Sequence, residues 1–70
     1  MTGAEFLRRL TRLGKQRDVP VAFDPGHGDG SHGRVYYGRS FTTLKDRKKE
    51  IGRGLLRGMC KQLGVDPRDL

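Results

Sequence analysis

A histidine set among small residues is the side chain best suited to chemistry in this sequence. His32 follows Gly30 and Ser31 and precedes Gly33, where a glycine-rich stretch leads into a predicted strand. Imidazole exchanges protons near neutral pH and can therefore serve as a general acid or base. Small neighbours leave room for a bulky substrate, and the N–H groups of such a loop can bind phosphate. The same residues also fit a surface histidine beside a turn, so both interpretations stay open.

Other chemistries have less support in the residues. A phosphate-binding P-loop would continue into Gly-Lys-Ser or Gly-Lys-Thr, which this glycine cluster does not do, and the chain has no room for a dinucleotide-binding unit. A metal site would need His27 and His32, with Asp24 or Asp29. Two histidines five residues apart in a glycine-rich loop lack the fixed geometry of a ligand set. We therefore expect no metal and no cofactor.

The charge indicates a polyanionic partner. The 70 residues include 15 Lys and Arg against 8 Asp and Glu, a formal net charge of +7. This excess favours binding to nucleic acid or to an acidic protein and says nothing of the fold. The short length predicts one domain over residues 1–70 with a thin core.

The single cysteine and the lack of long apolar runs indicate the cellular compartment. Its single cysteine, Cys60, rules out an intramolecular disulfide and lies on an apolar stripe, so we expect a buried, inert thiol. No apolar run approaches the ~20 residues of a transmembrane helix, and no apolar stretch follows Met1 as in a signal peptide. We expect a cytoplasmic protein without a membrane partner.

The first segment has the pattern of an amphipathic helix. Thr2 and Glu5 have the spacing of a capping box, and the helix is expected to end at Gly14 or at Arg17. The apolar positions that recur at helical spacing are Phe6, Leu7, Leu10 and Leu13. The basic positions outside this stripe are Arg8, Arg9, Arg12 and Lys15. These cations form either a solvated surface or an RNA contact.

Alternation predicts strands over residues 19–23, 31–37 and 40–45. Pro20 donates no hydrogen bond, so the first strand should lie at a sheet edge or begin there. A tight turn at residues 38–39 should pair the other two strands as an antiparallel hairpin. The faces of this hairpin are expected to carry Val35 and Tyr37 on one side, and Arg34 and Tyr36 on the other.

A second helix is expected to begin near Gly52 or Arg53, after a basic connection at residues 45–49. Its predicted apolar positions are Leu55, Leu56, Met59, Cys60 and Leu63. Gly64 has the place of a C-cap glycine, and Asp66 with Pro67 begins one more turn. The predicted fold is α+β with the order α-β-β-β-α: a three-stranded antiparallel sheet with two helices on one face.

Several motifs together resemble one known family. Gly-Ser-His-Gly at residues 30–33, Tyr-Tyr-Gly at 36–38 and Thr-Thr-Leu-Lys-Asp at 42–46 are similar to the HicA toxins of bacterial type II toxin–antitoxin systems. The tail, with Gly-Leu-Leu at 54–56 and Lys-Gln-Leu-Gly at 61–64, looks like the second helix of that family. Gly-Ser-His alone is a weak motif. The combination, which covers nearly the whole chain, is specific.

The resemblance implies a double-stranded-RNA-binding-domain-like fold and a metal-independent mRNA interferase, an endoribonuclease that cleaves mRNA and blocks translation. The catalytic histidine of the family corresponds to His32. A HicB-type antitoxin would cover the active site, giving a larger hetero-oligomer, whereas the free toxin is expected to be a monomer. This sequence departs from the family in a longer passage at residues 25–29, which adds His27, and in Arg53 where many members have proline.

Without a metal, the 2′-hydroxyl of RNA is the simplest nucleophile. His32 would act as general base on it or as general acid on the leaving oxygen, and Lys45, backed by Lys48 and Lys49, would offset the charge of the phosphorane. Tyr36 either stacks a base or donates a hydrogen bond, or is only a sheet-surface tyrosine. The residues expected to bind RNA or support the transition state are Gly30, Ser31, Arg34, Tyr36, Lys45, Lys48 and Lys49. The expected substrate is single-stranded RNA.

Two other functions remain open on the sequence. A non-catalytic RNA-binding module of the same fold explains the charge and the element order, but it would tolerate substitution of His32. A small module that binds an acidic protein explains the charge alone, and it would not co-purify with RNA.

Overall fold

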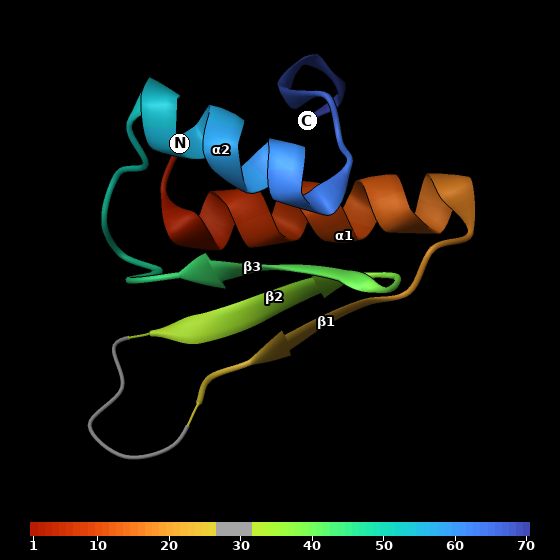
Figure 1. Ribbon diagram of the computed structural model, residues 1–70, viewed down its shortest axis with the longest axis horizontal. Coiled ribbons are helices and arrows are strands. Elements are labelled where there is room, and N and C mark those ends of the chain that lie inside the picture. The colour runs from red at the N-terminus through yellow and green to blue at the C-terminus, as the bar shows by residue number, and fades with distance from the viewer. Residues whose placement is uncertain (27–31) are drawn as a thin grey trace.

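Two helices cover one face of a three-stranded sheet in the computed structural model, which describes residues 1–26 and 32–70 (Figure 1). The elements in chain order are α1 (Gly3–Arg17), β1 (Val21–Asp24), β2 (Gly33–Tyr37), β3 (Ser40–Leu44), α2 (Arg53–Leu63) and the short 3-10 helix η1 (Pro67–Asp69). The predicted α+β class is confirmed. Both helices lie on the same side, and no helix of the described residues covers the opposite face of the sheet.

The sheet has the strand order β1-β2-β3 and is antiparallel throughout. Gly38 has a φ of +62° and begins the two-residue turn between β2 and β3, as the first central residue of a hairpin turn of type II′ does. The turn closes on the pair Tyr37 and Ser40. This register then fixes which residues of β2 and β3 face one another along the whole hairpin, so the predicted hairpin is confirmed.

The strands differ from the prediction at their ends. β1 covers Val21–Asp24 rather than residues 19–23, because Pro20 has no N–H for the ladder. The carbonyl of Pro20 still accepts a hydrogen bond of 2.8 Å from the N–H of Gly38. β3 ends at Leu44, one residue before the predicted end, and β2 begins at Gly33. The predicted first residue of that strand, Ser31, lies outside the described residues.

The core lies between the sheet and the helices. Its buried apolar residues are Phe6, Leu10, Leu13, Val35, Leu44, Ile51, Met59, Cys60, Leu63 and Val65. The prediction was wrong for Leu55, which is 52% exposed. At about 100° per residue, Leu55 falls at the margin of the helical stripe centred on Leu56, Cys60 and Leu63. The predicted burial of Cys60 is confirmed, and desolvation raises the pKa of its thiol.

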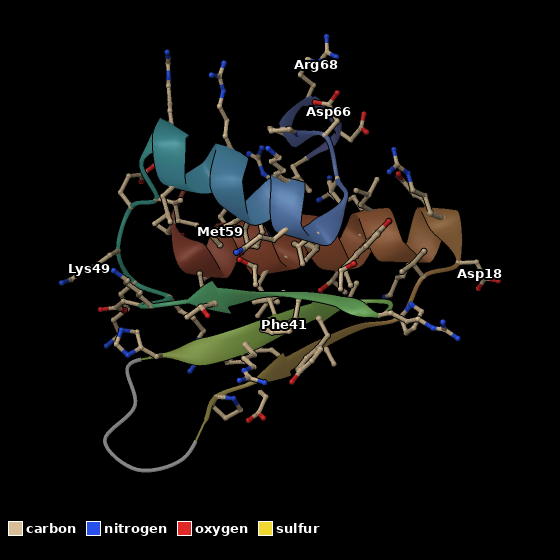
Figure 2. The ribbon with its side chains drawn as sticks, viewed as in Figure 1. Asp18, Phe41, Lys49, Met59, Asp66 and Arg68 are labelled. Atoms are coloured by element: carbon tan, nitrogen blue, oxygen red, sulfur yellow. The ribbon has the colours of Figure 1, made fainter. Side chains whose placement is uncertain are left out.

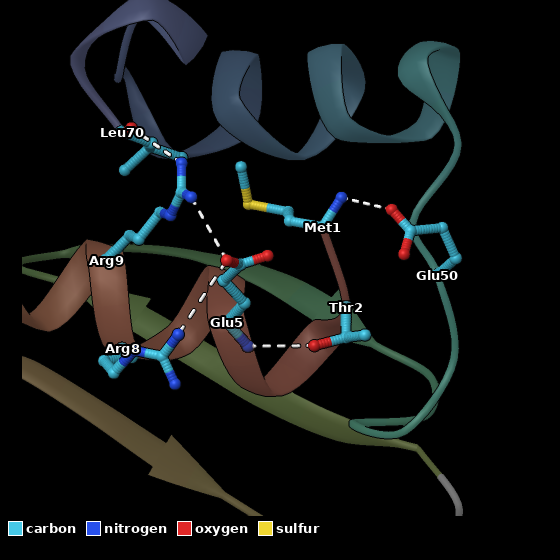
Figure 3. A network of polar contacts seen from close by, with 7 residues as sticks. All are labelled: Met1, Thr2, Glu5, Arg8, Arg9, Glu50 and Leu70. Carbon is cyan, nitrogen blue, oxygen red and sulfur yellow. Dashed lines mark hydrogen bonds and ion pairs between the residues drawn. The ribbon is translucent and has the colours of Figure 1, made fainter.

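Polar contacts around Glu5 link the start of α1 to the C-terminal end of the chain (Figure 3). The Oγ1 atom of Thr2 accepts a hydrogen bond of 3.2 Å from the Glu5 N–H, which confirms the predicted cap. The Glu5 carboxylate pairs with Arg9 at 3.1 Å and with Arg8 at 3.8 Å instead of turning back to Thr2. Arg9 in turn donates to the main-chain oxygen of Leu70 at 3.2 Å. The C-terminal turn is thereby held against α1.

The structure shows where the two helices end. α1 continues through a buried Gly14 to Arg17 and ends at Asp18, whose φ is +58°. A Cβ atom at Gly14 would lie 2.6 Å from the carbonyl oxygen of Val19, so the glycine allows the chain to turn closely back toward the sheet. α2 ends at Gly64 with a φ of +72°, as predicted for a C-cap glycine.

Candidate functional site

His32 lies directly before β2 and is exposed. It lines a shallow hollow of about 410 Å³ with Asp24, Gly26, Gly33, Arg34 and Thr43. The antiparallel register explains why these residues meet: Asp24 pairs with Arg34, and Arg34 pairs with Thr43 on the next strand. A carboxylate, a guanidinium and a hydroxyl group therefore form one row across the sheet, and His32 lies two residues before the central member, Arg34.

Two glycines bring the chain together at this hollow. Gly26 has a φ of +81°, donates its N–H to the Asp24 carboxylate at 2.9 Å, and would place a Cβ atom 2.7 Å from the His32 carbonyl oxygen. A Cβ atom at Gly33 would lie 2.7 Å from the Asp24 carbonyl oxygen and 2.7 Å from the Phe23 ring. The space beside Gly33 is thus filled by the protein itself.

The groups in the hollow have complementary chemistry. Arg34 offers a planar cation that suits phosphate oxygens. His32 offers a group for proton transfer. Asp24 adds a negative charge next to Arg34 and limits how strongly the hollow attracts a polyanion. The arrangement can therefore hold one phosphate and move one proton beside it.

The lysines predicted for the site do not line this hollow. Lys45 and Lys49 line a groove of about 400 Å³ between β3 and α2, whose wall includes the apolar residues Leu55 and Met59. Figure 2 shows Lys49 projecting outward from the connection between β3 and α2. Lys48 lines a third hollow together with Phe23 and Gly33, among others. Arg34 and His32 therefore line one hollow, and the three lysines line neighbouring surfaces. Lys45 directly follows Leu44, which pairs with Gly33 next to His32.

Tyr36 belongs to a cluster on the open face of the sheet. The register places it opposite Phe41, and the two ring centroids are 5.9 Å apart. The guanidinium carbon of Arg34 lies 4.8 Å from the centroid of the Phe41 ring. Neither Phe41 nor Asp24 was predicted to bind RNA. The position of Phe41 could have been predicted from the sequence, because a two-residue turn at residues 38–39 already sets it opposite Tyr36.

Some basic residues of α1 form hydrogen bonds and ion pairs within the protein. Arg9 binds Glu5 and the oxygen of Leu70, and Arg17 forms an ion pair of 2.7 Å with Asp69. The hydrogen bond to Asp69 raises the pKa of Arg17. Arg9 therefore has a structural role, which neither interpretation of this helix surface included. Arg8 and Arg12 are exposed.

The remaining predictions concern metals, membranes and the glycine-rich loop. Across residues 1–26 and 32–70, no group of three His, Cys, Asp or Glu side chains is placed to hold a metal ion. None of the helices in this part of the chain is both long and apolar enough to cross a membrane. His27, Asp29, Gly30 and Ser31 lie outside the described residues.

Comparisons with known proteins do not assign this chain to a family. No protein-family model, no curated protein and no solved structure matches it.

Proposed function

We propose that this chain is a metal-independent endoribonuclease, an mRNA interferase toxin of the HicA type with a double-stranded-RNA-binding-domain-like fold. The observation that supports this most directly is the exposed His32 sharing one hollow with Arg34. Supporting observations are the net charge of +7 and the resemblance of the motifs at residues 30–33, 42–46 and 54–64 to the family.

In this mechanism RNA supplies its own nucleophile. The 2′-oxygen attacks the adjacent phosphorus while the bond from phosphorus to the 5′-oxygen breaks, giving a 2′,3′-cyclic phosphate and a free 5′-hydroxyl. His32 takes the proton from the 2′-hydroxyl or gives one to the leaving 5′-oxygen, a role worth ~10²–10⁴ in rate. Arg34, which shares the hollow, offsets the charge of the phosphorane together with Lys45.

The proposed partners follow from the same assignment. The substrate is single-stranded mRNA, because an unpaired strand can reach the in-line geometry of the attack. A HicB-type antitoxin covers the hollow and keeps the enzyme inactive in the cytoplasm. The free toxin is a monomer, and the complex is a larger hetero-oligomer.

RNA cleavage in excess EDTA tests the proposal. The purified protein should cut a single-stranded RNA, and His32→Ala should lose at least ~10²-fold in rate while it retains the circular dichroism spectrum of the parent. His27→Ala, which removes the other histidine, is the matched control and should retain full activity. Equal activity in the parent and His32→Ala, or none in either, would refute the assignment. RNA binding without cleavage by the parent would favour the non-catalytic module.

A further inference from the structure

An exposed aromatic ring lies beside the His32 hollow, on the face of the sheet that carries no helix. Phe41 is 47% exposed. Its ring has Arg34 on one side, at 4.8 Å, and Tyr36 beside it, with the two ring planes inclined by 42°. We call Arg34, Tyr36 and Phe41 the stacking platform.

The platform is organised by the strands that carry it. Tyr36 and Phe41 are directly opposite one another on β2 and β3, and Arg34 lies two residues before Tyr36 on the same face of β2. Neighbouring rings and a guanidinium placed over a ring hold one another in position. An isolated exposed apolar side chain is ordinary on a protein surface. An exposed ring that is held by a cation and a second ring is a preformed surface for a flat ligand.

We propose that the stacking platform binds an unstacked nucleobase of single-stranded RNA. This inference rests on the proposed function, which makes RNA the ligand, and adds a base-binding subsite with Phe41 at its centre. Every nucleobase has a π-face, and proteins bind unpaired bases by stacking them on aromatic rings or on guanidinium planes. The platform offers both kinds of surface.

Arg34 connects the platform to the hollow. Its guanidinium lies over Phe41, and the residue also lines the hollow of His32. Along the chain, His32 precedes Arg34 by two residues, which is about 7 Å if the backbone is extended. A base on the platform therefore belongs to a nucleotide that flanks the phosphate in the hollow. Stacking depends on ring area, so purines should bind more tightly than pyrimidines at this subsite.

Binding of an uncleavable oligonucleotide tests the platform separately from catalysis. The probes are two fluorescein-labelled 2′-deoxy oligonucleotides of equal length and charge, one of adenines and one abasic. Phe41→Leu keeps most of the apolar volume and removes the ring, and it should weaken binding of the adenine probe by about 5- to 150-fold, the range measured for loss of one base–aromatic stack. Arg34→Lys keeps the charge and removes the planar cation, and it should weaken the same probe.

Two controls separate stacking from charge and from general apolar contact. The abasic probe should bind the parent and Phe41→Leu equally, because both present the same charges to its phosphates. Leu55→Ala, which alters a second large apolar residue exposed in the described part of the chain, should leave the affinity for the adenine probe unchanged. Tyrosine fluorescence provides a second readout, since the chain has two Tyr and no Trp. It should be quenched by the adenine probe and not by the abasic one.

The outcomes are distinguishable from a failure of the nuclease assignment. If Phe41→Leu weakens both probes equally, or if the parent binds both with the same affinity, the platform does not bind a base and the inference is overturned. A protein-binding role for this face would give that same base-independent result. Base-dependent binding in a protein that fails to cut RNA would leave the platform standing and refute only the endoribonuclease.

Discussion

Adding a single methyl group at Gly33 measures how closely β1 and β2 approach beside His32. An alanine Cβ would lie 2.7 Å from the Asp24 carbonyl oxygen and from two carbons of the Phe23 ring. Unstrained contacts between carbon atoms are about 3.5–4.0 Å long. The ring would have to shift by about 1 Å, away from Gly33, and on another side it meets the guanidinium of Arg47, 5.1 Å from its centroid. The carbonyl oxygen belongs to a paired strand and cannot move without disturbing the ladder.

Overpacking of this kind destabilises a core by about 1–3 kcal/mol. In a domain of this size each kcal/mol lowers Tm by about 4–8 °C. Gly33→Ala should therefore melt about 5 to 20 °C below the parent when unfolding is followed by circular dichroism. Gly58→Ala is the matched control: Gly58 is exposed in α2 and a Cβ there meets nothing within 4 Å. That change should stabilise the chain by about 0.5–1 kcal/mol.

A double variant identifies the atoms responsible. Phe23→Leu removes the ring from the contact, so combining it with Gly33→Ala should cost less than the sum of the two single changes. The destabilisation that Gly33→Ala still causes in the Phe23→Leu background reflects the clash with the Asp24 carbonyl. A Gly33→Ala protein that melts within about 2 °C of its parent would refute this account of the close approach.

Three further outcomes are expected from charge and burial. Burial raises the pKa of Cys60, so the folded chain holds the thiol proton more tightly than the unfolded chain does. The contribution of this thiol to the free energy of unfolding should be constant below about pH 8.5 and fall above it. In urea titrations at several pH values, Cys60→Ala should lose this decrease. The hydrogen bonds from Arg68 lower the pKa of Asp66. Their small contribution to the free energy of unfolding should therefore be present above the ordinary carboxyl pKa and be lost as the pH falls through the lowered pKa of Asp66. If Asp66→Asn showed the same dependence of unfolding free energy on pH as the parent, this expectation would be contradicted. RNA affinity should fall steeply with salt, and a salt-independent Kd would contradict an electrostatic contribution from the net charge of +7.

The elements that the sequence predicted well are those specified by local chemistry. Thr2 caps α1 by a bond to an amide three residues away, and Gly64 ends α2 because it adopts a positive φ without strain. The turn at Gly38 follows the same principle and sets the register of β2 against β3. These features depend on residues close in sequence, which is why they could be predicted without a structure.

The candidate site was predicted in part for the same reason. His32 and Arg34 are two residues apart in the predicted strand of residues 31–37, so alternation alone places them on the same side. Lys45 was assigned to the site from its place at a strand end. It lines a groove with α2, and the pairing of Leu44 with Gly33 keeps this strand end beside His32. Asp24 enters the hollow from β1, and its pairing with β2 spans the glycine-rich loop, whose length leaves the register open.

The sequence by itself determined which segments become helices and strands, where the helices are capped, and that one histidine stands among small residues. Only the tertiary structure decided that Gly33 makes room for the Phe23 ring, that Arg9 holds the C-terminal turn, and that Phe41 stays exposed under Arg34. The physical reason is that capping and alternation act over a few residues, whereas packing depends on contacts between segments distant in the chain. Such contacts are settled only when the sheet and both helices have come together.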